Sequence, residues 1–101
     1  ALDSEAYEVG GKSGGAAIAI GLIALVEGKE VVPGVIISGE LESDGTIGSV
    51  DKLDAKIKVA ADLDVDTFLI PEGQCNTTNK NVSMQIICVG SIEEAIPYMI
   101  Q

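Results

Sequence analysis

The chain carries a serine, Ser13, and a lysine, Lys56, but no histidine. Without histidine it can assemble neither a Ser-His-Asp triad nor a Cys-His pair, and lysine is the alternative base that activates a serine hydroxyl. Ser13 and Lys56 are therefore the candidate nucleophile and general base of a hydrolase. Whether they can work together depends on the elements that carry them.

Lys56 lies on a helix predicted over residues 51–63, where its neighbours at three- and four-residue spacing are mostly apolar: Leu53, Val59 and Ala60, with Lys52 on the remaining side. Burial among apolar groups disfavours the charged ammonium, and a neutral amine can accept a proton. The simpler interpretation, which the helical pattern alone favours, is that Lys56 extends its ammonium along an apolar face to water.

Lys58 on the same helix shows a different pattern. It has Asp54 and Asp62 four residues away on either side, which predicts an exposed, ion-paired lysine. The two lysines therefore have different predicted surroundings, mostly apolar for Lys56 and acidic for Lys58.

Ser13 begins a helix predicted over residues 13–27, directly after Gly10-Gly11-Lys12. A nucleophile at a helix start has backbone N–H groups beside it that can stabilise an oxyanion. Serine is also a favoured N-cap, and on this pattern alone capping is the simpler role. A phosphate-binding loop is disfavoured, because Ala6 stands where that motif requires its first glycine.

Length and charge limit the class of protein. The chain has 101 residues, of which 47% are hydrophobic, and this predicts one small domain over residues 1–101. Its net charge of -10 would repel nucleic acid and anionic membrane surfaces. The apolar run over residues 14–26 is shorter than the roughly 20 residues that span a bilayer, so it predicts a buried helix.

Strand and helix patterns alternate along the chain, which predicts an α/β (α+β) fold with a small mixed sheet packed by helices. A capping-box pattern, Ser91 to Glu94, opens the last helix, and Pro97 interrupts it. The expected strands cover residues 6–9, 35–37, 67–70 and 84–89, with a hairpin or bent strand over 38–47 and helices over 13–27 and 51–63.

Motifs from Ser13 to Gly73 resemble, without a gap, the catalytic core of the Lon protease family. The serine segment Ser13-Gly14-Gly15-Ala16-Ala17 is similar to the family's Ser-Ala-Gly-x-Ala, and Ser38-Gly39-Glu40-Leu41 is similar to its Thr-Gly-Glu-Ile. Further similar segments are Gly45-Thr46-Ile47, Leu53-Asp54-Ala55-Lys56-Ile57, Ala60-Ala61, the strand at 67–71, and Val89-Gly90-Ser91-Ile92-Glu93-Glu94-Ala95. The family's catalytic lysine falls on Lys56.

The resemblance implies a Lon proteolytic-domain-like fold and a serine endopeptidase that works through an acyl-enzyme. Ser13 would attack the peptide carbonyl and Lys56 would accept its proton. Ser38 matches the threonine whose hydroxyl positions the lysine. The backbone N–H groups of Gly11, Lys12 and Ser13 would bind the oxyanion. The alternative is a catalytically inactive Lon-like module used for binding or assembly.

The chain departs from the family pattern at two turns. Gly10-Gly11-Lys12 replaces Asp-Gly-Pro or Glu-Gly-Pro before the serine, and Val50-Asp51-Lys52 replaces Ile-Gly-Gly before the lysine helix. The family also has an N-terminal half-domain and an ATPase module ahead of the serine, which this sequence lacks. We therefore expect the C-terminal part of a proteolytic domain, which is either a piece cut from a longer chain, with the missing N-terminal fragment as a candidate partner, or a shortened relative.

The resemblance also bears on cofactors and partners. No metal and no cofactor is expected in this chain, and ATP would act only through an ATPase module elsewhere. The expected partner is a protein or peptide substrate, not nucleic acid. Members of the family form ring-shaped oligomers, so a homo-oligomer is a further candidate assembly for this chain.

Cys75 and Cys88 flank a polar stretch that holds two N-glycosylation triplets, at Asn76 and Asn81. Two free thiols, with Cys88 in a strand core, are the alternative. Cysteines and triplets together favour a Cys75–Cys88 disulfide and an extracytoplasmic or membrane-associated location over a cytoplasmic one.

Overall fold

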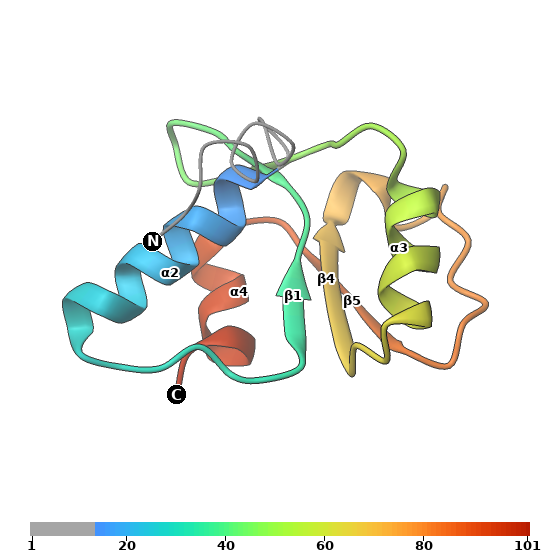
Figure 1. Cartoon of the computed structure of the whole chain (residues 1–101). Coiled ribbons are helices and arrows are strands. Elements are labelled where there is room, and N and C mark those ends of the chain that lie inside the picture. The colour runs from blue at the N-terminus through green and yellow to red at the C-terminus, as the bar shows by residue number, and fades with distance from the viewer. Residues whose placement is uncertain (1–13) are drawn as a thin grey trace.

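A computed structural model describes residues 14–101 of the chain as a mixed α/β domain (Figure 1). The predicted alternation of strands and helices is confirmed over these residues, whereas the strand predicted at 6–9 lies outside them. The elements are α2 (Gly15–Glu27), β1 (Val35–Ile37), β2 (Glu40–Leu41), β3 (Ile47–Gly48), α3 (Leu53–Asp62), β4 (Thr67–Pro71), the short 3-10 helix η2 (Glu72–Gln74), β5 (Gln85–Val89) and α4 (Ile92–Met99).

The central sheet has three parallel strands in the order β1-β4-β5. Ile36 pairs with Phe68, which pairs in turn with Ile86. Four of the five residues of β4 are buried, as expected for the central strand of a sheet covered on both faces.

Helices cover the two faces of this sheet separately, with α2 and α4 on one side and α3 on the other (Figure 1). Successive side chains of a strand point to opposite faces, so β4 contributes to two cores. Leu69 packs with α2 and α4, whereas Phe68 and Ile70 pack with α3. The first core contains Ala16, Ile20, Ile37, Ile47, Leu69, Val89, Ala95 and Met99, and the second contains Val50, Leu53, Ile57, Ala60, Phe68, Ile70 and Met84.

The apolar helix α2 buries only one of its faces. Ala16, Ile20 and Ala24 are buried, and the helix ends at Gly28, whose left-handed φ of 68° suits a C-cap glycine. Its other face exposes apolar side chains, including Leu22 and Leu25. In the described part of the chain, no helix is long and apolar enough to cross a membrane.

The segment between β1 and α3 is a hairpin and not a single bent strand. Strands β2 and β3 pair antiparallel around a turn in which Gly45 has a φ of 89° and donates its N–H to the Glu42 carbonyl at 3.0 Å. The Asp44 carboxylate accepts hydrogen bonds from the hydroxyl and the backbone N–H of Thr46, at 2.7 and 3.0 Å. These bonds hold the pKa of Asp44 below its usual value.

The last helix begins as its sequence predicts. Ser91 occupies the N-cap, and its hydroxyl accepts a hydrogen bond from the Glu94 N–H at 3.2 Å. Pro97 lies inside α4, which nevertheless continues to Met99. The predicted interruption costs this short helix one backbone hydrogen bond, because proline has no N–H.

Candidate active site

An open groove of about 610 Å³ runs between α3 and the β1 side of the sheet. It exists because α3 covers β4 and β5 but leaves Ile36 on the edge strand β1 partly uncovered, at 37% exposure. The lining is almost wholly apolar and consists of Ile36, Ile37, Ser38, Lys52, Ala55, Lys56, Val59, Ala60, Leu63, Val65 and Phe68. Such a surface suits apolar side chains of a ligand.

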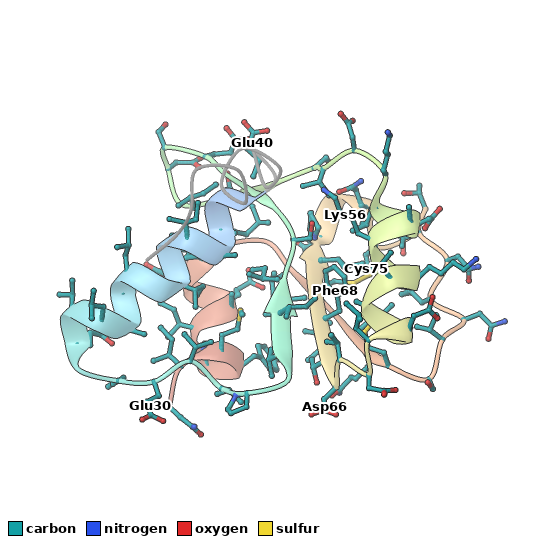
Figure 2. The ribbon with its side chains drawn as sticks, in the orientation of Figure 1. Glu30, Glu40, Lys56, Asp66, Phe68 and Cys75 are labelled. Carbon is teal, nitrogen blue, oxygen red and sulfur yellow. A yellow bond between two sulfur atoms is a disulfide. The ribbon has the colours of Figure 1, made fainter. Side chains whose placement is uncertain are left out.

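Lys56 lies in the wall of this groove. It is partly buried on α3, beside the buried face that Leu53, Ile57 and Ala60 form against the sheet. Figure 2 shows Lys56 near the N-terminal end of α3, beside the carboxyl end of β4. Its surroundings are thus mostly apolar, as the helical spacing predicted.

Lys58 is exposed, also as its spacing predicted. Its predicted ion pairs are wrong, since no salt bridge within residues 14–101 joins Lys58 to Asp54 or Asp62. Exposed lysines gain little from such pairs, which explains why the spacing did not produce them.

Ser38 lines the same groove and directly follows β1. It is 6% exposed, and its N–H continues the sheet by donating to the Leu69 carbonyl at 3.0 Å. The fold therefore brings Ser38 and Lys56, which are 18 residues apart in the sequence, to one groove.

The start of α2 lies against the segment that follows Ser38. The Ala16 N–H donates to the Gly39 carbonyl at 3.2 Å. Any larger residue at position 39 would have to displace the Ile47 side chain, because a Cβ atom there would overlap the Ile47 Cγ2 methyl group. The N-cap position of α2 belongs to Gly14, and the predicted site residues Gly11, Lys12 and Ser13 lie outside the described residues.

The turn into α3 has an unexpected conformation and an unexpected partner. Lys52, the N-cap of α3, has a φ of 57°, in the left-handed region that favours glycine. The Gln74 carboxamide forms two hydrogen bonds of 2.9 Å with Val50, donating to its carbonyl and accepting from its N–H. No spacing rule points to a glutamine in a loop, so sequence reasoning missed this contact.

The predicted disulfide joins Cys75, at the end of η2, to Cys88 on β5, with their Cα atoms 5.9 Å apart. Asn76 and Asn81 are exposed on the loop that this bond closes. The loop also contacts α3, since the Asn79 N–H donates to the Asp54 carboxylate at 3.1 Å. Among the described residues, no group of three histidine, cysteine or acidic side chains could hold a metal ion.

Comparison with known proteins adds the family to this geometry. The chain is 35% identical over 80 residues to the DNA repair protein RadA of Synechocystis sp., an alignment that covers 79% of the chain but 15% of RadA. The chain thus spans a small part of that relative's length. Residues 4–100 match the family model of the Lon protease (S16) C-terminal proteolytic domain. A match over nearly the whole chain shows that this protein belongs to the Lon protease C-terminal proteolytic domain family.

Proposed function

We propose that this chain carries the catalytic serine and lysine of a serine endopeptidase of the Lon family. The observation that carries the proposal is that Lys56 and the buried Ser38 share one apolar groove in a chain of this family. The start of α2 is hydrogen-bonded to Gly39, next to Ser38, and Ser13 comes immediately before Gly14, the N-cap of that helix, in the sequence. These contacts support a site at the carboxyl end of β1.

The proposed reaction needs no group beyond the chain, the substrate and water. The Ser13 hydroxyl oxygen attacks the carbonyl carbon of the scissile peptide while the neutral Lys56 amine accepts the hydroxyl proton. The tetrahedral intermediate collapses to an ester as Lys56 returns the proton to the leaving amine. Water then attacks the ester with Lys56 again as base, which releases the acid and restores Ser13.

Two further groups have supporting roles in the proposal. The Ser38 hydroxyl positions the Lys56 amine, and the backbone N–H groups of Gly11, Lys12 and Ser13 stabilise the oxyanion. The groove beside Lys56 accepts an apolar side chain of an extended peptide, because its walls offer few polar partners.

The test compares hydrolysis of casein and of fluorogenic peptides by full-length variants. Ser13→Ala and Lys56→Met should each lower kcat/KM by about a thousand-fold or more. Lys58→Met is the matched control, because Lys58 is an exposed lysine on the same helix, and it should leave the rate unchanged. Ser38→Ala should lower the rate. Ser38→Thr, which keeps a hydroxyl group at this position, should retain most of the wild-type rate. Undiminished hydrolysis by Ser13→Ala or by Lys56→Met would refute the proposal.

A non-catalytic binding or assembly module is the second candidate. It is favoured by one observation, that the similar protein RadA is described as a DNA repair protein and not as a protease. A peptide boronate distinguishes the two, because it forms a covalent adduct with an activated serine. An adduct that Ser13→Ala abolishes supports the peptidase, whereas a folded wild-type protein with neither adduct nor hydrolysis supports the binding module.

A further inference from the structure

Gln74 makes two side-chain hydrogen bonds to the segment that leads into α3. Its carboxamide oxygen accepts from the Val50 N–H and its carboxamide nitrogen donates to the Val50 carbonyl, both at 2.9 Å. Val50 is 8% exposed and both bonds are part-buried, so removing them would leave two backbone groups with reduced access to water. A single side chain therefore fixes both backbone groups of a residue six positions before Lys56.

The segment between Val50 and Lys56 needs such a restraint. Lys52 holds a left-handed conformation that costs a non-glycine residue free energy, so the turn has a tendency to relax. From Leu53 onward the backbone is helical, and the Lys56 N–H donates to the carbonyl of the N-cap Lys52 at 3.1 Å. A shift at Val50 would thus move the helix turn that carries Lys56.

The other end of this contact is anchored. Gln74 ends η2, and the next residue, Cys75, is covalently bonded to Cys88 on β5. The Asn79 N–H adds a second contact from the same loop, to the Asp54 carboxylate in the first turn of α3. The loop is therefore covalently bonded to β5 at one end and hydrogen-bonded to the first turn of α3 through Asn79.

We propose that Gln74 is a positioning residue for Lys56, which acts through Val50 and the Lys52 turn and is held in place by the Cys75–Cys88 disulfide. The inference concerns the placement of the Lys56 amine and rests on the proposed function only for its effect on catalysis. Gln74 itself does not line the groove.

The test pairs two substitutions of the same type in the full-length protein. Gln74→Met keeps the length of the side chain but removes both hydrogen bonds. Gln85→Met is the matched control, because Gln85 is an exposed glutamine on β5 whose side-chain oxygen accepts a hydrogen bond from the Thr67 hydroxyl at 3.4 Å. Gln74→Glu retains the acceptor for the Val50 N–H and loses the donor, so it should give an intermediate result.

The first measurement does not depend on activity. Limiting acylation with acetic anhydride, followed by mass spectrometry, gives the reactivity of Lys56 relative to the exposed Lys58. In Gln74→Met the acylation of Lys56 relative to Lys58 should rise at least about threefold, because Lys56 is partly buried in the groove wall and a released side chain is more open to the reagent. This ratio should stay at the wild-type value in Gln85→Met. Circular dichroism and thermal melting ensure that only folded protein is compared.

The second measurement is kinetic. Gln74→Met should lower kcat about 10- to 100-fold with little change in KM, because a misplaced general base slows chemistry more than binding. An unchanged acylation ratio in folded Gln74→Met overturns the positioning role whatever the activity. A wild-type protein without peptidase activity refutes the proposed function instead, and the acylation ratio still decides the role of Gln74.

Discussion

Cys75 and Cys88 form a disulfide that ties the loop after η2 to the edge strand β5, across a sequence separation of 13. A cross-link of this loop length restricts the unfolded chain and is worth about 3 kcal/mol. Replacing both cysteines by alanine should therefore lower the free energy of unfolding by about 3 kcal/mol. Urea unfolding monitored by circular dichroism measures this loss.

Reductant supplies the control for this prediction. Wild-type protein under dithiothreitol should unfold at a urea concentration near that of the double variant, which should itself be insensitive to reductant. Equal stability of the wild-type protein and the double variant, both without reductant, would contradict the stabilising role.

Lys52 adopts a left-handed conformation that glycine adopts without penalty. Lys52→Gly should therefore raise the free energy of unfolding by about 1 kcal/mol, because it relieves the steric cost of the side chain. Asp64→Gly is the comparison, since Asp64 has a similar φ of 59° but aspartate tolerates this region better. Its gain should be smaller. A loss of stability in Lys52→Gly would show that the lysine side chain itself stabilises the turn.

The Asp44 carboxyl should titrate below the usual range of aspartate, because the hydroxyl of Thr46 and then its backbone N–H favour the charged form. A pKa that is lower in the folded than in the unfolded protein stabilises the fold above the unfolded pKa, which is about 3.9. This contribution disappears as the pH falls through the lower, folded pKa.

NMR titration of the Asp44 carboxyl carbon checks the direction. Thr46→Val should raise the pKa of Asp44 toward its usual value, whereas Thr77→Val, at a threonine elsewhere on the surface, should leave it unchanged. An Asp44 pKa that does not respond to Thr46→Val would contradict the assigned cause.

The two glycosylation triplets differ in what the fold exposes. Asn76 and Asn81 are both exposed, but Thr78 of the first triplet is 9% exposed, whereas Ser83 of the second is open to solvent. We propose that Asn81 is the better acceptor of an N-linked glycan when the protein passes through an oxidising, glycosylating compartment. Intact mass before and after amidase treatment of secreted protein should show a glycan that Asn81→Gln removes.

Asn79→Gln is the matched control for this experiment, because Asn79 lies on the same loop but outside a triplet. It should leave the glycan in place. A secreted wild-type protein of unmodified mass would contradict the proposal.

The sequence determined much of the fold because local patterns and tertiary packing agree. The apolar run that becomes β4, the capping box of Ser91 and Glu94, and Gly28 at the end of α2 all have the structures that their residue types predict. The motifs around Ser38 and Lys56 were also enough to identify the family, which residues 4–100 confirm. Short-range physics and motif order were sufficient for these results.

Tertiary structure alone decided how the candidate site is supported. The groove exists because α3 covers β4 and β5 but not β1, and no pattern within a single helix or strand contains that offset. The Gln74–Val50 contact joins residues 24 positions apart, and the left-handed Lys52 contradicts the local preference of lysine. Contacts of this kind depend on which segments the fold brings together, and their energies can exceed the preferences of individual residues.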